Sequence, residues 1–417
     1  MTRRALILIE GHPRGGLQYI QAARRLGLHP ITLSVDPDWY DYIAAESIEA
    51  IRVDTDNLDA LIHECSRLRA TYDIAGITGA LDSVYPTVGK LCRHFDLPGP
   101  NPASVARCCD KFTQRQLLAE AGLPVPAYRL AANAADVERF AAEIGLPVIL
   151  KPAQGSGSRG VRLCRNVDEL AEHTTYLLGG QHIWQSSPRI LVEEFAQGPY
   201  YCAELVGNTV IGVGAGDCPP PHFVFREFTL PALLSDDDHE RIADVSLSCL
   251  RALGLGWGPT CIEFRWTKLG PVVIEVNPRL GGPPGPQLVQ LAYGVDLVTE
   301  HIKLAIGEEL DLRRKHSHTA AARLLVPDRD GTLDRIDGDR LAAAVPGVAE
   351  VKWYIGPKAL IVRRGDLRDW IGCVIATSPS RDRTEAILQR AVDLIAWSIT
   401  PISTLGEQEE VVSHRVV

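Results

Sequence analysis

The chain has 417 residues, of which 46% are hydrophobic and 23% charged, and its formal net charge is -9. This length allows two to four domains with a sizeable core, and an acidic chain without long Lys/Arg runs argues against a nucleic-acid partner. The ten cysteines show no CxxC or zinc-ligand spacing, and no apolar stretch reaches the ~20 residues of a membrane span. We therefore expect a cytoplasmic protein without a signal peptide or membrane segment.

The first hundred residues alternate strand-like and helix-like patterns. The predicted elements are strands at residues 5–9, 30–35 and 74–78 and a helix at residues 17–26. Such alternation is typical of a parallel sheet with crossover helices. A Pro-rich stretch at residues 97–102 marks a boundary. We therefore predict a Rossmann-like domain over residues 1–103.

A second domain of mixed, largely antiparallel α+β structure is predicted over residues 104–309. Its expected helices and strands are residues 110–121, 135–143, 147–150, 160–163, 189–192, 201–207, 261–264 and 272–275. A third, α/β domain is predicted over residues 310–400 and ends in a long amphipathic helix at residues 383–399. Residues 401–417 form a polar tail.

Residues 155–160, Gly-Ser-Gly-Ser-Arg-Gly, match the GxGxxG pattern of dinucleotide-binding proteins. That fingerprint must open a helix, whereas residues 161–164 are typical of a strand. A glycine loop between two strands favours a flap whose backbone N–H groups cover phosphates, with Lys151 just before it as a counter-charge. A plain hairpin loop with a solvated lysine is an alternative of about equal weight.

Two carboxylates in strongly apolar strands are the sharper observation. Glu263 lies in Thr-Cys-Ile-Glu-Phe and Glu275 in Val-Val-Ile-Glu-Val, so each needs a partner if buried. Asn277 and Arg279 follow Glu275 at two-residue steps and therefore share its strand face. Hard oxygen ligands suit Mg2+ together with nucleotide phosphates, and the arginine suits a phosphate or carboxylate. A structural Glu–Arg network is the weaker alternative.

Three other features are weak signals when taken alone. Residues 193–196 follow an apolar strand and could read adenine through backbone groups, although an ordinary acidic strand end is the stronger interpretation. Lys111, which opens a helix after Asp110, could be an ordinary surface lysine. The glycine turn at residues 11–16, with Asp36 at the next strand end, has the wrong spacing for a dinucleotide fingerprint, so a tight turn is favoured.

Taken in chain order, these features resemble the ATP-grasp carboxylate–amine/thiol ligases. The matching order is Lys111, Lys151 with its glycine loop, Glu193-Glu194-Phe195, Glu263, and Glu275-Val-Asn-Pro-Arg279-Leu-Gly-Gly282. The resemblance covers about residues 1–400. It implies an ATP-grasp fold, α/β and α+β in class, with an N-terminal Rossmann-like domain and a C-terminal closing domain.

The resemblance also implies a role for each matching residue. Lys111 and Lys151 would contact the nucleotide phosphates, and Gly157 and Ser158 would belong to the closing loop. The adenine hinge would be Glu193, Glu194, Phe195 and Ala196. Glu263, Glu275 and Asn277 would hold the metal ions, and Arg279 would stabilise the transferred phosphoryl group.

Within that family the chain is most similar to the L-amino-acid ligases, the bacilysin-type dipeptide synthetases. Phe225-Arg-Glu227 lies shortly before Pro231, so Glu227 is the implied ligand of the substrate amino group. The spacing to that proline is shorter than in the subfamily. His222 is implied to lie near the nucleotide. Gly281 and Gly282, which follow Arg279, would shape the acyl-substrate pocket.

The implied function is an ATP-dependent ligase that joins a carboxylate, expected to be an amino acid, to an amine through an acyl phosphate. Two Mg2+ ions are the expected cofactors, with Mn2+ as a substitute, and a homodimer is one assembly that the resemblance allows. The alternatives are a ligase for a citrate-like or other natural-product carboxylate, a nicotinamide-dependent oxidoreductase, and a non-catalytic nucleotide-binding module. The retained lysines, carboxylates and Arg279 argue against the last.

Overall fold

A computed structural model describes residues 2–180 and 188–401. The predicted polar tail therefore lies outside the described residues, apart from Pro401. In chain order, the N-terminal part contains β1 (Arg3–Ile9), α1 (Gly16–Arg25), β2 (His29–Ser34), η1 (Pro37–Trp39), α2 (Asp41–Ala45), β3 (Glu49–Arg52), α3 (Leu58–Arg69), β4 (Tyr72–Gly79), η2 (Asp82–Val84), α4 (Tyr85–His94) and α5 (Pro102–Cys109).

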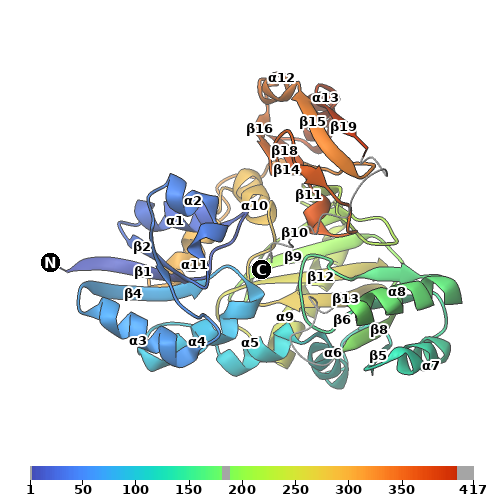
Figure 1. The fold of residues 1–417 in the computed structure, drawn as a ribbon, viewed down its shortest axis with the longest axis horizontal. Helices are drawn as coiled ribbons and strands as arrows, with labels where there is room; N and C mark the ends of the chain where they lie inside the picture. Colours follow the sequence, from blue (N-terminus) through green and yellow to red (C-terminus); the bar gives the residue numbers. More distant parts are fainter. Residues whose placement is uncertain (1, 181–187, 402–417) are drawn as a thin grey trace, which may run out of the picture.

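The N-terminal part forms a four-stranded sheet in the order β3-β2-β1-β4 (Figure 1), and its strands are parallel, as predicted. Strand β1 is buried on both faces, as parallel sheets covered by helices require. Leu6 and Leu8 belong to a core shared with α1, whereas Ala5, Ile7 and Ile9 belong to a second core shared with α3 and α4. The alternation of side chains along the strand therefore divides this one segment between two cores.

The middle part has two lobes. Its elements are α6 (Lys111–Glu120), β5 (Tyr128–Ala131), α7 (Ala134–Ile144), β6 (Val148–Pro152), β7 (Arg162–Cys164), α8 (Val167–Gly179), β8 (Ile190–Glu194), β9 (Tyr200–Val206), β10 (Thr209–Asp217), β11 (Glu227–Leu230), α9 (Asp236–Leu253), β12 (Pro259–Thr267), β13 (Gly270–Asn277), α10 (Gly285–Tyr293) and α11 (Leu297–Ala305). The smaller lobe is an antiparallel sheet in the order β5-β8-β6-β7.

The larger lobe is part of an eight-stranded sheet in the order β13-β12-β9-β10-β11-β14-β18-β16, which runs on into the C-terminal part. That part contains β14 (Thr319–Leu325), β15 (Gly331–Asp337), α12 (Asp339–Ala343), β16 (Val348–Trp353), β17 (Leu360–Ile361), η4 (Leu367–Asp369), β18 (Gly372–Ser378), α13 (Arg381–Asp393) and β19 (Ala396–Thr400). It stands above the larger lobe in Figure 1. No helix in the described parts of the chain is long and apolar enough to cross a membrane.

The long helix predicted at residues 383–399 is wrong in its last six residues. Helix α13 ends at Asp393, and residues 396–400 form β19. This strand pairs with β15 about sixty residues earlier in the chain, with Trp397 opposite Ile336 and Ile399 opposite Leu333. Pairing with a distant strand thus overrides the helical periodicity of the local sequence.

Candidate active site

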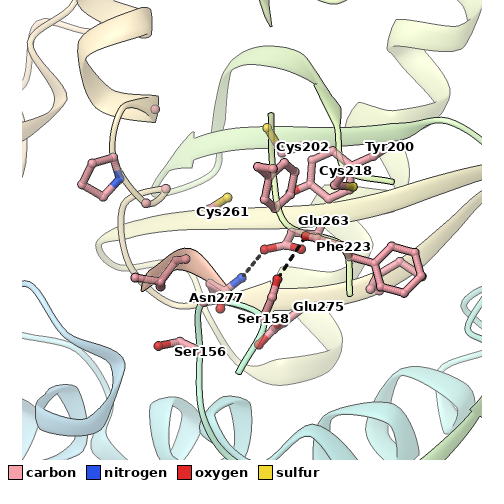
Figure 2. A pocket seen from close by; sticks show the side chains of 18 of the residues that line it. Ser156, Ser158, Tyr200, Cys202, Cys218, Phe223, Cys261, Glu263, Glu275 and Asn277 are labelled. Atoms are coloured by element: carbon pink, nitrogen blue, oxygen red, sulfur yellow. Dashed lines mark hydrogen bonds between the residues drawn. The ribbon is translucent and has the colours of Figure 1, made fainter. Parts of the chain in front are cut away.

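A cavity of about 320 Å³ lies between the two lobes of the middle part. Its walls come from the N-terminal turn, the glycine loop 155–160, β8, β12, β13 and the loop that follows β13. Leu367 and Trp370 of the C-terminal part close one side. Figure 2 shows Glu263, Glu275 and Asn277 grouped on the sheet, with Ser158 of the glycine loop near them. The cavity therefore brings together groups that lie far apart in the sequence.

Glu263 and Glu275 face each other directly across β12 and β13. Burial, followed by the neighbouring charge of Glu275, raises the pKa of Glu263. Burial also opposes ionisation of Glu275, but Lys111 and Lys151 outweigh it and lower the pKa of that carboxylate. Two opposed carboxylates in one enclosed site repel each other, so this pair favours bound cations.

Asn277 and Arg279 extend this row, as the two-residue spacing predicts. The Asn277 amide nitrogen donates to Glu263 Oε1 at 3.4 Å, and Arg279 Nη2 donates to the Asn277 amide oxygen at 3.3 Å. The Arg279 guanidinium also pairs with Asp82 of η2 at 2.7 Å. Burial lowers the pKa of Arg279, but the Asp82 carboxylate more than offsets this and raises it. Arg279 thus stays charged inside the cavity.

These groups fit Mg2+ by their chemistry. The described residues contain no cluster of three His, Cys, Asp or Glu side chains suited to a metal ion. The opposed pair, Glu263 and Glu275, offers hard carboxylate oxygens, and Mg2+ commonly takes one or two carboxylates and completes its shell with phosphate oxygens and water. For Asn277 to add its oxygen, its amide would have to turn, because the nitrogen now faces Glu263.

The two predicted lysines enter the cavity from different elements. Asp110 caps α6 by accepting from the Thr113 amide at 2.8 Å, which fixes Lys111 as the first helical residue. Lys111 Nζ lies 2.9 Å from Glu275 Oε1 and donates to the Gly155 carbonyl at 2.5 Å. Burial lowers its pKa, but the Glu275 carboxylate more than offsets this and raises it.

Lys151 sits at the end of β6, where the sequence predicts it. Its Nζ lies 2.5 Å from Glu193 Oε2, while Arg115 Nε lies 2.7 Å from the other oxygen of the same carboxylate. Burial lowers the pKa of Lys151, an effect that Glu193 only partly offsets. Two cations therefore occupy the Glu193 carboxylate, and only the backbone groups of this residue remain available to a ligand. Glu194, Phe195 and Ala196 also line the cavity.

The glycine loop connects β6 to β7 and opens no helix, which confirms the strand–loop–strand interpretation. Gly157 has φ +69°, and a Cβ there would lie 1.8 Å from Leu367 Cδ2. Its carbonyl accepts from the Leu367 amide at 3.2 Å. Ser158 Oγ donates to the Phe223 carbonyl at 3.4 Å (Figure 2). The loop is therefore held against both the larger lobe and the C-terminal part.

Comparison with known proteins agrees with this geometry. A family model described as the carbamoyl-phosphate synthase L chain, ATP binding domain, matches residues 110–313, and another described as L-amino acid ligase C-terminal domain 2 matches residues 323–400. The crystal structure of an L-amino acid ligase from Bacillus licheniformis has a TM-score of 0.79, covering 96% of this chain and 100% of that one at 20% identity. The chain belongs to the ATP-grasp ligases.

Two relatives extend the comparison. A Sinorhizobium fredii protein described as uncharacterized protein y4rH is 63% identical over 98% of this chain and 86% of its own length. Carnosine synthase 1 of Mus musculus is 28% identical to this chain. The alignment covers 69% of this chain and 38% of that enzyme. As an ATP-grasp ligase with an L-amino-acid-ligase C-terminal domain, this protein forms C–N bonds at the expense of ATP.

The structure does not bring Glu227 to the cavity of this ATP-grasp ligase. Its carboxylate accepts from both Nε and Nη2 of Arg323 on β14, at 2.9 and 2.6 Å, and Glu227 is not among the residues that line the cavity. Strand β11 pairs with β14 with Glu227 opposite Arg323, so the register itself makes this ion pair. The role implied for Glu227 has no support in this arrangement.

His222 is also outside the cavity lining, although the next residue, Phe223, is part of it. The imidazole packs against Gly365, where a Cβ would lie 2.6 Å from its Cγ, and it bonds to the backbone of Val161 just after the glycine loop. Burial lowers its pKa. His222 therefore contacts the surroundings of the loop and does not face the space between the lobes.

The N-terminal turn contributes to the cavity, but not as a dinucleotide site. His12, Arg14 and Gly15 line the cavity, whereas Tyr40 and Tyr42 fill the space at Gly11 and Gly16. A Cβ at Gly16 would lie 2.1 Å from the Tyr42 hydroxyl, so the backbone there is covered by protein. The tight-turn interpretation is confirmed.

Three residues that sequence reasoning missed belong to the site. Asp82 forms an ion pair with Arg279, and Arg115, which lies behind the cavity wall, forms an ion pair with Glu193. Glu204 lies on β9, is buried, and lines the cavity beside the loop that follows Arg279. Glu204 carried the same signal as Glu263, a carboxylate in the apolar strand Tyr-Tyr-Cys-Ala-Glu-Leu-Val, whereas Asp82 and Arg115 carried none.

Proposed function

We propose that this protein joins an amino-acid carboxylate to an amine through an acyl phosphate and releases ADP and phosphate. The observation that carries the proposal is the opposed pair Glu263 and Glu275, with Arg279 and two lysines, in one cavity that the glycine loop and Leu367 enclose. Phosphoryl transfer needs just such positioning of charge around the transferred group.

Residue roles follow from the contacts. Glu263, Glu275 and Asn277 would hold two Mg2+ ions, for which Mn2+ could substitute. When bound, these ions would neutralise the triphosphate and polarise the γ-phosphoryl group. Lys111 and Lys151 would contact the phosphates, exchanging their present carboxylate partners in part for phosphate oxygens.

The adenine would lie against the hinge formed by residues 193–196, next to Lys151 on β6. Because Arg115 and Lys151 hold the Glu193 carboxylate, the base would be read by backbone groups of the hinge. Gly157 and Ser158 would cover the phosphates from the opposite side, and Gly281 and Gly282 would border the acyl substrate. Residues 193–196, Lys151, Gly157, Ser158, Gly281 and Gly282 all line the same cavity.

The reaction has two steps. An oxygen of the substrate carboxylate attacks the γ-phosphorus while the bond to the β–γ bridging oxygen breaks, which yields an acyl phosphate and ADP. The amine nitrogen then attacks the acyl carbon, the carbon–oxygen bond to phosphate breaks, and the amine loses a proton. Arg279 would stabilise the phosphoryl group in both steps, and loop closure would keep water from the acyl phosphate.

A substrate panel tests this proposal. The enzyme is incubated with Mg2+, ATP and pairs of free L-amino acids, with phosphate release as the signal and mass spectrometry to identify products. Citrate and polyamines are included because a natural-product carboxylate or a non-amino-acid amine is the main competing substrate class. We expect phosphate release and a dipeptide with at least one pair. Products only from citrate or a polyamine would change the substrate class, and no phosphate release with any carboxylate would contradict the proposal.

A further inference from the structure

Glu204 is enclosed by the loop that carries Arg279. Only 4% of the residue is exposed, and its Oε2 accepts from the Gly281 amide at 3.2 Å. A Cβ on Gly281 would lie 1.9 Å from the other oxygen, Oε1, so only glycine lets the loop approach this carboxylate so closely. The Gly281 backbone, two residues after the arginine of the active site, is therefore fitted to Glu204.

The sheet register places Glu204 next to the opposed carboxylate pair. In one row across three strands, Cys202 lies opposite Glu263, which lies opposite Glu275. In the next row on the same face, Glu204 lies opposite Cys261, which lies opposite Asn277. Same-face rows are roughly 7 Å apart, so a small group such as an ammonium fits between Glu204 and the opposed carboxylates.

Glu204 has no cationic partner within 4.0 Å in the part of the chain that the structure describes. Three other carboxylates around the cavity have cationic partners: Glu193 pairs with Lys151 and Arg115, Glu275 with Lys111, and Asp82 with Arg279. Glu263 has no such partner among the described residues, but it opposes Glu275 and is one of the proposed metal ligands. A buried carboxylate without a cation is costly, and burial raises the pKa of Glu204 to about 7. This arrangement favours a ligand that brings its own positive charge.

We propose that Glu204 receives the ammonium group of the amine substrate. Glu204 first accepts one ammonium proton, which frees the nitrogen lone pair. The nitrogen then bonds to the acyl carbon, the carbon–oxygen bond to phosphate breaks, and the second proton leaves with the phosphate. This inference rests on the function proposed above. Glu227, which the family resemblance implies as the ligand of the substrate amino group, is held by Arg323 outside the cavity.

Two nucleophiles separate this role from the rest of the reaction. Hydroxylamine is uncharged at neutral pH and traps an acyl phosphate as a hydroxamate, so it reports the first step without a bound ammonium group. The amino-acid amine reports both steps. Glu204→Gln is the informative variant because its amide oxygen can still accept from the Gly281 amide while the negative charge is lost.

We expect Glu204→Gln to form hydroxamate from amino-acid carboxylates at a rate within about threefold of wild type. Its KM for the amine in amide formation should rise by tens of fold, the usual cost of losing a charged hydrogen-bond partner. Glu204→Asp, which keeps the charge, should recover part of that loss. Glu227→Gln is the matched control and should leave the KM for the amine unchanged.

The outcomes separate the two claims. If wild-type enzyme forms no hydroxamate from any carboxylate, the proposed function fails. If wild type forms hydroxamate but Glu204→Gln makes amide with an unchanged KM, or loses hydroxamate and amide formation equally, Glu204 does not receive the amine. A raised KM in Glu227→Gln alone would return the role to Glu227. Circular dichroism checks folding, and Glu204→Asp decides the matter on the same criteria if the glutamine variant does not fold.

Discussion

Arg115 carries a permanent charge in a position with no exposed surface. Its guanidinium lies 2.7 Å from Glu193, contacts the Ile274 carbonyl on β13, and borders the Gln114 amide oxygen at 3.4 Å. It thereby joins α6, the hinge on β8 and the strand that carries Glu275. We infer that Arg115 acts as a brace beneath the site, since the residue lies outside the cavity lining.

Arg115→Met should destabilise the protein by about 3–5 kcal/mol, because it leaves Glu193 buried with one of its two cations missing. Arg129→Met is the matched control, since Arg129 and Glu143 form an exposed pair at 3.1 Å, and its removal should cost less than about 1 kcal/mol. Urea unfolding followed by circular dichroism measures both. Equal shifts in the two variants would rule out the brace.

His301 makes stability depend on pH. It is fully buried between Tyr19 Oη and Thr78 Oγ1, at 2.7 and 3.1 Å, and burial lowers its pKa to about 3. The unfolded chain, with a pKa of about 6.5 for histidine, therefore binds more protons below that pH, and the cost of keeping His301 neutral reaches roughly 2 kcal/mol at pH 5. It vanishes above about pH 6.5.

His301→Gln should thus lose about 2 kcal/mol less stability than wild type between pH 7 and pH 5. The comparison between variants matters because the raised pKa of Glu204 acts with the opposite sign in the same window. Unfolding free energies at the two pH values provide the measurement, with the exposed His63→Gln as a control that should keep the wild-type pH dependence. A variant as acid-sensitive as wild type would disprove the assignment.

Single residues were predictable where strand spacing reveals them. A carboxylate in an apolar strand with polar residues at two-residue steps identified Glu263, Glu275, Asn277 and Arg279, and the structure groups them. Glu204 is also a carboxylate in an apolar strand, but no other polar residue follows it at a two-residue step, so its strand is predicted only as part of the hydrophobic core. Arg115 gave no signal, because its partner Glu193 lies 78 positions away and only the fold brings them together.

At the scale of elements, the loop of residues 364–370 connects the glycine loop to the rest of the protein. Asp369 accepts from the Arg364 and Gly365 amides at 2.7 and 2.9 Å, which makes the 364–370 loop self-supporting. Its Leu367 packs on Gly157, and the Leu367 carbonyl accepts from Arg14 Nη1 at 3.1 Å. Leu367 thus bridges the glycine loop, through its side chain, and the N-terminal turn, through its backbone carbonyl.

Leu367→Ala should loosen the glycine loop and admit water to the acyl phosphate. We expect the ratio of phosphate released to amide formed to rise several-fold while folding is retained. Leu341→Ala, at an exposed position of α12 in the same C-terminal part, is the control and should keep the wild-type ratio. An unchanged ratio in Leu367→Ala would show that this contact does not seal the site.

Elements were predictable where local pattern and tertiary pairing agree. Strands β1, β2 and β4 of the N-terminal sheet and the strand–loop–strand arrangement around Lys151 follow from apolar runs and glycine positions, whereas β3 was not predicted. Residues 396–399 follow the helical periodicity of the predicted helix but form a strand, because their strand character comes from pairing with β15, which periodicity does not report. The ion pair of Glu227 is a similar case, since only the register of β11 with β14 brings Arg323 opposite to it.

At the scale of the whole molecule, three parts of the chain meet around one cavity. Asp82 ties the N-terminal part to Arg279, and Arg14 lies over the rings of Tyr354 and Trp370 at 4.3 and 5.1 Å. The continuous eight-stranded sheet links the metal-binding strands proposed here to the C-terminal part. Such links hold the three parts together around the cavity and so fix the positions of the groups that line it.

The variant Glu275→Gln tests the proposed metal site. The glutamine keeps the shape of the side chain but removes a charge that opposes Glu263 and pairs with Lys111. We expect carboxylate-dependent ADP release to fall by at least about 100-fold, a loss typical of removing a group that stabilises the transition state. Circular dichroism should show an intact fold, and near-normal turnover would rule out the assignment.

The path of one oxygen atom tests the acyl-phosphate mechanism most directly. An amino acid labelled with 18O in its carboxylate is converted with Mg2+, ATP and an amine, and the released phosphate is analysed by mass spectrometry. The mechanism predicts one 18O atom in phosphate for each amide formed, with ADP as the nucleotide product. Unlabelled phosphate, or label recovered in AMP, would contradict it.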